Sequence, residues 1–157
     1  MVEINSWQFS VPTEVGVLTV EGNAFFVTYA GFHRDKQLSG KTGDCALKAE
    51  AKKQVKSYLS DASMQFELPV MAHGSQFQQS VWSVLEQIPP GQTRTYGEVA
   101  RILGSSARAV GGACKKNPVA VIVPCHRVVA ANGLGGYGGK TAGNNLRIKS
   151  WLLAHEA

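Results

Sequence analysis

The chain has 157 residues, of which 44% are hydrophobic and 17% charged, which fits one compact globular domain or two small ones that share a core. It contains no apolar run of about 18 residues and no signal-peptide layout, so we expect no membrane partner and a location in the cytosol, or in the nucleus if the source is eukaryotic. Cys45, Cys114 and Cys125 have no CxxC spacing, which argues against a disulfide framework and against a zinc site.

The net charge of +5 is distributed unevenly along the chain. Residues 1–74 hold seven Lys/Arg and eight Asp/Glu, a net charge of −1, whereas residues 75–157 hold nine Lys/Arg and three Asp/Glu, a net charge of +6. A basic half is typical of a protein that binds a polyanion, nucleic acid above all, although surplus surface lysine and arginine would give the same balance.

The first part of the chain has the pattern of an antiparallel sheet. Residues 7–11 alternate apolar and polar side chains and predict one strand. The β-branched and aromatic runs 17–20 and 25–29 predict two more strands, and Glu21-Gly22-Asn23 between them is a turn signal, so these two strands are expected to form a hairpin.

A loop, a helix and a connector are predicted next. Residues 31–44 are rich in Gly, Lys, Asp and Ser, which is typical of a loop. Apolar residues four apart predict a helix over 46–59. Residues 60–74 have the pattern of a connector, in which alternation over 64–68 predicts a short extended segment.

The second part is predicted to be mainly helical and contains two capping-box patterns. Ser75 with Gln78 predicts the start of a helix that Pro89-Pro90-Gly91 ends. Thr95 with Glu98 predicts the start of a second, shorter helix.

A tight turn then joins two short helices. Gly104 is suited to end the first of them, and Ser105-Ser106 caps a second helix from 107 to about 116, which gives a helix-turn-helix pattern. A buried apolar run at 119–123 and a Gly-rich loop follow, and 145–155 is predicted to be a last amphipathic helix.

The helix that begins at 107 has one face of small residues and carries Arg108 as the single long side chain near its N-terminus. Gly111 and Gly112 inside it cost about 1 kcal/mol each relative to alanine, so a compensating contact is expected. Close helix–helix packing would explain the small face. Close approach to a nucleic-acid backbone or a narrow groove, with Arg108 as the projecting probe, would explain it too.

Cys125, His126 and Arg127 come shortly after the buried apolar run. A lone cysteine is most often an inert core residue, but adjacent basic groups lower the pKa of a thiol and raise its thiolate fraction. A nucleophile and its base need a third, orienting group, usually a carboxylate. The basic half offers Glu86, Glu98 and Glu156. Glu98 is assigned to a cap, and Glu156 at the end of the last helix is the best remaining candidate, with a frayed C-terminal residue as the alternative.

These residues together resemble a known family. The segment Asn117-Pro118-x5-Pro124-Cys125-His126-Arg127-Val128-Val129 is similar to the active-site signature of the O6-alkylguanine-DNA alkyltransferases, the methylated-DNA–protein-cysteine methyltransferases. The resemblance is dense and specific over residues 75–157, whereas residues 1–74 match only in a general way. Flanking segments match in the family's order, at residues 95–100, 107–111, 135–137 and 151–156.

The resemblance implies a fold and two domains. Residues 1–74 would form an α/β supporting domain, with a small ribonuclease-H-like antiparallel sheet, a helix and a connector. Residues 75–157 would form a mainly α, winged helix-turn-helix-like domain that binds DNA and accepts the alkyl group. The protein would be a monomer that needs no cofactor and repairs double-stranded DNA bearing O6-alkylguanine, with activity on O4-alkylthymine left open. Each molecule would act once, because an S-alkyl thioether is not readily hydrolysed.

The resemblance also implies roles in the reaction. Cys125 would be the acceptor thiolate, His126 would take its proton through a bound water, and Glu156 would orient His126. The main chain at Cys125 and Val128 would accept hydrogen bonds from the guanine amino group. The loop after Tyr137 would close over the base and supply a main-chain N–H to O6.

Further residues would open the duplex and hold the extruded base. Arg108 would fill the space left by the flipped nucleotide, Tyr96 would help to rotate that nucleotide and hydrogen-bond the departing guanine, and Asn117 would brace the turn before the active-site strand. Binding from the minor groove needs a slim helix. That slim face is formed by Ala107, Ala109 and Gly111.

Three features depart from the family's pattern. Gly138 stands where a serine often follows the loop tyrosine, which removes a side-chain contact and makes the loop more flexible. The stretch 139–145 is longer than in shorter relatives, which affects the alkyl groups that fit. Residues 1–74 hold one cysteine and two histidines, His33 and His73, so we expect no structural zinc, and a chelator should leave the melting temperature unchanged.

Three other functions compete with alkyl transfer. Lesion-binding relatives without transfer activity replace the acceptor cysteine, which is present here at Cys125. A helix-turn-helix regulator would account for the charge distribution but not for the Cys125-His126 pair. A cysteine hydrolase would turn over and needs an oxyanion hole, of which the sequence gives no sign.

Overall fold

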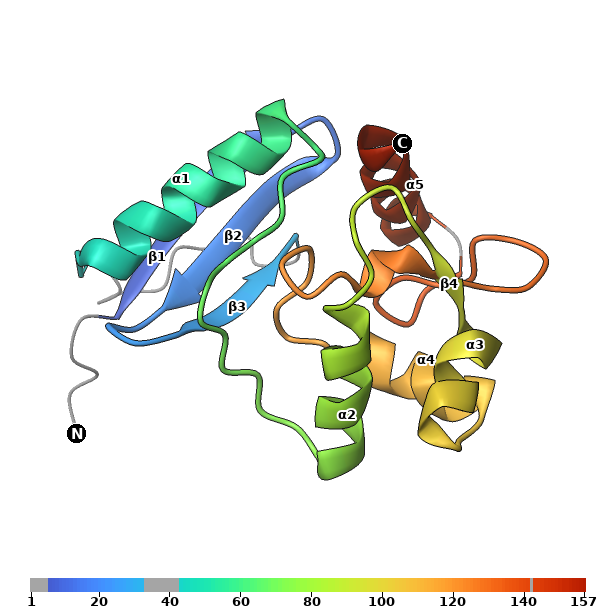
Figure 1. The fold of residues 1–157 in the computed structure, drawn as a ribbon. Helices are drawn as coiled ribbons and strands as arrows, with labels where there is room; N and C mark the ends of the chain where they lie inside the picture. Colours follow the sequence, from blue (N-terminus) through green and yellow to red (C-terminus); the bar gives the residue numbers. More distant parts are fainter. Residues whose placement is uncertain (1–5, 33–42, 142) are drawn as a thin grey trace.

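The computed structural model describes residues 6–32, 43–141 and 143–157. A small antiparallel sheet lies at one side of the molecule, and helix α1 (Ala46–Ser60) packs against it (Figure 1). The sheet consists of three strands in chain order, β1 (Trp7–Thr13), β2 (Gly16–Gly22) and β3 (Val27–Gly31). The three predicted strands and the predicted helix over 46–59 are therefore confirmed.

The turn between β2 and β3 lies later than the sequence pattern indicates. β2 continues to Gly22, and the side chain of Asn23 accepts hydrogen bonds at 2.9 Å from the backbone N–H groups of Phe25 and Phe26. Asparagine favours such local turns over strand pairing. Phe25 and Phe26 therefore belong to the turn, and Phe25 is exposed.

The connector touches the sheet at one point. The extended segment predicted at 64–68 is not a strand; instead Val27 N–H donates to Pro69 O at 2.8 Å, and Met71 N–H donates to Val27 O at 2.9 Å. Proline has no N–H to donate, which limits the ladder at this point. Most of the loop predicted at 31–44 lies outside the described residues.

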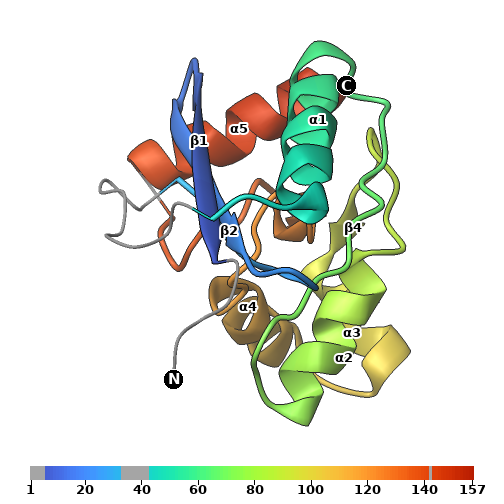
Figure 2. The same cartoon turned by 90° about the vertical axis from the view of Figure 1, so that its left-hand side faces the viewer.

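The rest of the chain is mainly helical. Figures 1 and 2 show α2, α3 and α4 grouped at one end of the molecule, whereas α5 lies beside α1 at the other. The elements are α2 (Gln76–Leu85), β4 (Arg94–Thr95), α3 (Tyr96–Leu103), α4 (Ala107–Lys115), the 3-10 turn η1 (Cys125–Arg127), β5 (Val128–Val129) and α5 (Asn144–Glu156).

The predicted helix ends are largely confirmed by hydrogen bonds. Both capping boxes are present, at the starts of α2 and α3, and Ser106 caps α4 by accepting from Ala109 N–H. Gly104 ends α3 with a φ of 64°, a conformation that favours glycine. α2 ends at Leu85, earlier than Pro89, because the intervening residues form a tighter turn with hydrogen bonds three residues apart.

The apolar run 119–123 differs from the expected active-site strand. It forms a turn in which Val121 has a φ of 72°, an uncommon value for a β-branched residue. The run still joins the sheet, since Ala120 N–H donates to Ala30 O at 2.9 Å. Apolar composition predicted its burial correctly but could not distinguish a strand from a buried turn.

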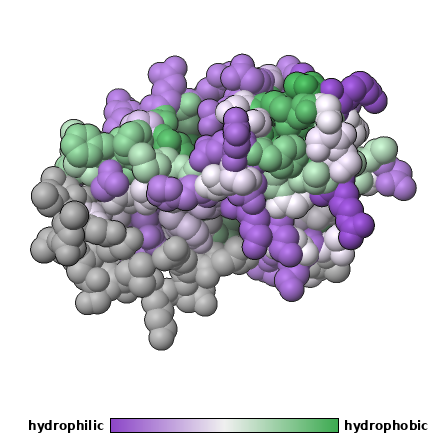
Figure 3. Space-filling model, turned by 90° about the horizontal axis from the view of Figure 1, so that it is seen from below, coloured by the Kyte–Doolittle hydropathy of each residue, from purple (hydrophilic) through white to green (hydrophobic). Residues whose placement is uncertain are grey.

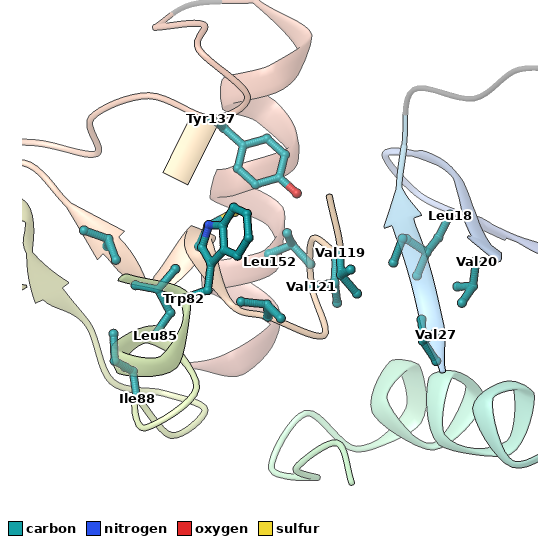
Figure 4. Packing of buried hydrophobic residues seen from close by; sticks show 14 of the residues in the cluster. Leu18, Val20, Val27, Trp82, Leu85, Ile88, Val119, Val121, Tyr137 and Leu152 are labelled. Carbon is teal, nitrogen blue, oxygen red and sulfur yellow. The ribbon is translucent and has the colours of Figure 1, made fainter. Parts of the chain in front are cut away.

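One hydrophobic core joins the two parts of the chain, so a boundary between residues 74 and 75 stays a prediction. The pair β4–β5 is parallel and two residues long, and a wing and a ribonuclease-H-like sheet also stay predictions. In the part of the chain that the structure describes, no helix has both the length and the hydropathy to cross a membrane. Figure 4 shows core residues from both parts, including Leu18, Val20, Val27, Trp82, Leu85, Val119, Val121 and Leu152.

Candidate active site

A cavity of about 380 Å³ opens between α3, α4 and the loop that follows β5. Figure 3 views the end of the molecule that α2, α3 and α4 form, where hydrophilic side chains surround hydrophobic ones. A second cavity, of about 360 Å³, lies between the connector and the end of α2, and no predicted site residue lines it. The first is lined by the predicted residues Tyr96, Ala107, Arg108, Gly111, Cys125, Tyr137 and Gly138.

Cys125 lies at the start of η1, where its N–H donates to Val123 O at 2.8 Å. Burial raises the pKa of its thiol; a hydrogen bond with Asn117 and the charge of Lys149 lower it in part. The expectation that adjacent basic residues lower the pKa of the thiol is therefore wrong for Arg127, because its guanidinium is paired with Glu156. A neutral thiol needs a base before it can react as a thiolate.

His126 and Glu156 are brought together as expected. His126 Nε2 lies 2.8 Å from Glu156 Oε2, and both side chains are buried. Glu156 is the last residue of α5 and is fixed, so the alternative of a frayed terminal residue is wrong. Burial lowers the pKa of His126, and the hydrogen bond and charge of Glu156 raise it in part. A neutral His126 whose Nε2–H faces the carboxylate leaves its Nδ1 lone pair available to accept a proton.

Glu156 accepts further hydrogen bonds that the sequence analysis did not predict. Arg127 donates through Nε to Oε1 at 2.8 Å and through Nη2 to Oε2 at 2.9 Å, and Tyr58 Oη donates to Oε2 at 2.6 Å. Burial raises the pKa of Glu156, but the hydrogen bonds from His126, Arg127 and Tyr58 outweigh it and hold that pKa well below its usual range. The carboxylate is therefore ionised and oriented.

Asn117 braces the turn before Cys125 from the side of α4. Its Nδ2 donates to Val123 O at 2.9 Å, and its Oδ1 accepts from Val119 N–H at 3.0 Å. Asn117 does not line the main cavity but an adjacent one of about 190 Å³. Ala109 and Val128 line neither cavity.

Lys149 is a site residue that sequence reasoning missed. It is fully buried in α5, and its Nζ donates to Val128 O at 2.6 Å and to Gly136 O at 2.9 Å. The same Nζ lies 3.5 Å from Tyr96 Oη. Desolvation lowers the pKa of Lys149 to about 8. Its spacing of three and seven residues from Leu152 and Glu156, on one helix face, is the signal that could have revealed it.

The loop after Tyr137 closes in a tight turn. Tyr137 and Lys140 exchange backbone hydrogen bonds at 2.8 and 3.1 Å, and Gly138 and Gly139 between them have φ values of 58° and 81°. Positive φ at both central residues is typical of a type I′ turn and favours glycine. Gly138 is therefore explained by the turn geometry; residue 142, in the longer stretch 139–145, lies outside the described residues.

The small face of α4 is not required by packing within the chain. α4 buries Val110 and Ala113 against its neighbours, and Trp82 Nε1 donates to Ala113 O at 2.9 Å. A Cβ at Gly112 would meet nothing within 4 Å, and a Cβ at Gly111 would meet only the Tyr96 ring at 4.0 Å. Close helix–helix packing is therefore not the reason for these glycines, and the small face remains accessible.

Within the described ranges, no cluster of three or more His, Cys, Asp and Glu side chains could hold a metal ion. His33 lies outside those ranges. The absence of zinc therefore stays a prediction.

Residues 76–157 match the family model described as "6-O-methylguanine DNA methyltransferase, DNA binding domain". The methylated-DNA–protein-cysteine methyltransferase of Methanosarcina acetivorans is 46% identical over 110 residues, 68% of this chain and 67% of that protein. The enzyme of the same name from Mycolicibacterium paratuberculosis is 38% identical over 153 residues, 94% of this chain and 90% of that protein.

Solved structures extend the similarity to nearly the whole chain. The crystal structure of Mycobacterium tuberculosis O6-methylguanine methyltransferase superimposes with a TM-score of 0.81 at 35% identity and covers 96% of this chain and 92% of that one. The Mycobacterium tuberculosis protein in complex with DNA gives a TM-score of 0.81 at 34% identity, with 95% and 92% covered.

Proposed function

This chain belongs to the methylated-DNA–protein-cysteine methyltransferase family of DNA-repair enzymes, and from that premise we propose that Cys125 is the residue that receives the alkyl group from O6 of guanine. One observation carries the proposal. Cys125 lines the cavity beneath the accessible small face of α4, and the buried His126–Glu156 pair follows directly behind it.

His126 is the base in this reaction. Because Nε2 donates to the ionised Glu156, the Nδ1 lone pair is the one that can take the thiol proton through a water molecule. Burial favours the neutral imidazole and the neutral thiol alike. Proton transfer therefore has to accompany the attack, and the negative Glu156 stabilises the imidazolium that forms.

The transfer exchanges one bond for another. The sulfur of Cys125 forms a bond to the alkyl carbon while the bond from that carbon to O6 breaks, and the electron pair leaves with the guanine. The thiol proton goes to His126, and water reprotonates the released guanine. Hydrogen bonds from Tyr96 Oη and from a main-chain N–H after Tyr137 stabilise the charge that develops on the base. The thioether product is not hydrolysed, so each monomer acts once.

The base reaches Cys125 by rotation out of the duplex. The alkylated oxygen is hidden in the stacked helix, and extrusion costs a few kcal/mol, less for a weakened pair. Arg108 is exposed on α4 at the rim of the cavity, and Ala107 and Gly111 leave room beside it. We assign Arg108 to the space that the extruded nucleotide leaves, with α4 in the minor groove.

Lys149 joins the segment that follows Cys125 to the loop that lines the cavity. Its Nζ donates to Val128 O and to Gly136 O, and of these two residues Gly136 lines the cavity. A carbonyl oxygen has two lone pairs, so Val128 O retains one for the guanine amino group. This arrangement supports a pocket whose acceptors are fixed before the base arrives.

The experiment that tests the proposal compares two cysteines of the same cavity. Cys125→Ser should abolish transfer from an oligonucleotide with one O6-methylguanine while it retains DNA binding. Cys114→Ser is the matched control, because Cys114 also lines the cavity and burial raises its pKa to about 12. Transfer that survives in Cys125→Ser and disappears in Cys114→Ser would contradict the proposal and identify Cys114 as the acceptor.

A further inference from the structure

Helix α1, from the first part of the chain, reaches the proton-accepting pair in the second part. Tyr58 Oη donates at 2.6 Å to Glu156 Oε2, the oxygen that also faces His126 Nε2 at 2.8 Å. Ninety-eight positions separate Tyr58 from Glu156 in sequence, yet Figures 1 and 2 show the C-terminal ends of α1 and α5 close to one another. Tyr58 is fully buried.

We propose that Tyr58 is a positioning residue for alkyl transfer, which fixes the Glu156 carboxylate and limits its attraction for a protonated His126. The proposal rests on the proposed role of His126 as the base. It also gives the first part of the chain a task in the chemistry beyond support of the fold.

The phenol of Tyr58 is held in place from several sides. His155 Nε2 lies 2.8 Å from the main-chain oxygen of Tyr58, and the two rings meet edge to face with centroids 5.2 Å apart. The Phe66 ring lies 5.3 Å from the phenol, and Trp151 stacks on His155 at 4.9 Å. A ring packed in this way directs its hydroxyl at one oxygen, as a positioning residue must.

The electrostatic effect of Tyr58 differs from that of Arg127. Both donate to Glu156 Oε2, but the phenol carries no charge, because burial and the nearby Glu156 raise its pKa far above the usual value. Tyr58 therefore withdraws charge from Oε2 without placing a cation beside His126. The charged groups that act on His126 are Glu156 and Lys149 from α5 and Arg127 from η1.

Loss of the hydroxyl should make His126 easier to protonate. In Tyr58→Phe, Oε2 keeps more negative charge against Nε2, so the imidazolium is favoured. We expect the pKa of His126 to rise by about one unit, the scale that one hydrogen bond to a charged group sets. The acidic limb of the pH–rate profile should move to higher pH by the same amount, because the base must be neutral to act.

Two measurements test this in the full-length protein. The first is the pKa of His126 from the NMR titration of its ring nitrogens without substrate, and the second is the pH–rate profile with free O6-benzylguanine. Trp7→Phe is the matched control, because Trp7 is a buried aromatic residue of the first part that donates one hydrogen bond, to Asn23 O at 2.8 Å. It should lower stability and leave both readouts unchanged.

A second replacement at position 58 should shift the pKa of His126 in the opposite direction. Site-specific 3,5-difluorotyrosine at position 58 is a stronger donor that keeps the ring, and it should lower the pKa of His126. A His126 pKa that stays the same in both variants, with rates reduced equally at every pH, would overturn the proposal and leave Tyr58 a structural residue. If Cys125 is not the acceptor, transfer will survive in Cys125→Ser. The NMR titration of His126 is made without substrate, so its result does not depend on which residue accepts the alkyl group.

Discussion

His126 Nε2 and Glu156 Oε2 lie 2.8 Å apart although 30 residues separate them in sequence, and both side chains are buried. The contact joins η1 to the end of α5 and determines which imidazole nitrogen can accept a proton. Replacement of His126 by Ala should lower the rate of transfer to Cys125 by about 10²–10⁴-fold, the usual contribution of a positioned base. Single-turnover kinetics with O6-methylguanine DNA would measure this, and a rate within a factor of about two of the parent would exclude the role.

Arg127 should be important for stability rather than for DNA binding. Its guanidinium is buried and paired with Glu156, so Arg127→Met leaves a buried carboxylate without its cation. We expect the free energy of unfolding to fall by about 3 kcal/mol, measured by urea denaturation. Arg101→Met is the control, since Arg101 is exposed on α3. Adding Glu156→Gln to Arg127→Met should restore part of the loss, and a further additive loss would contradict the pairing.

Arg108 should contribute to the reaction on duplex DNA and not to the reaction with the free base. Arg108→Ala removes the exposed side chain assigned to the space of the extruded nucleotide. We expect repair of duplex DNA to slow by about tenfold or more, because extrusion costs a few kcal/mol that the arginine offsets. Reaction with free O6-benzylguanine requires no extrusion and should be nearly unchanged. Equal losses on the two substrates would rule out this role.

Lys149 should make stability depend on pH in the alkaline range. Its pKa is about 8 in the folded protein against an ordinary value of 10.5. Between these values the unfolded chain binds more protons, so Lys149 contributes stability that increases as pH rises from about 8 to 10.5. In Lys149→Met this contribution disappears, and the pKa values of the Cys125 and Cys114 thiols, which the charge of Lys149 lowers in part, rise further.

Melting temperatures of the parent and Lys149→Met from pH 7.5 to 10.5 provide the measurement. The difference, parent minus variant, should grow with pH. A constant difference would mean that Lys149 stays protonated throughout, with its charge stabilised by the carbonyls of Val128 and Gly136.

Local features were predictable from sequence because their signals are local. The capping boxes at Ser75 and Thr95 and the end of α3 at Gly104 depend on residues at most four apart. The apolar run 119–123 was predicted to be buried, but its turn depends on hydrogen bonds from Asn117 and contact with the sheet. Composition does not encode that dependence.

The candidate site was predictable in part. Cys125, His126 and Glu156 were candidates from the residues alone, and the family resemblance implied their roles. Tyr58 and Lys149 did not, because each resembles an ordinary helical residue until the fold brings the ends of α1 and α5 together. Their importance depends on contacts across 98 and 21 residues, to Glu156 and to Val128 O.

The most direct test is the mass of the intact protein after incubation with excess DNA that carries one O6-methylguanine. We predict a gain of one methyl group per chain, located in the peptide that contains Cys125, with no further gain at longer times. An unchanged mass together with tight lesion binding would contradict the account and indicate a protein that only recognises the damage. Repair of more than one lesion per chain would contradict it as well.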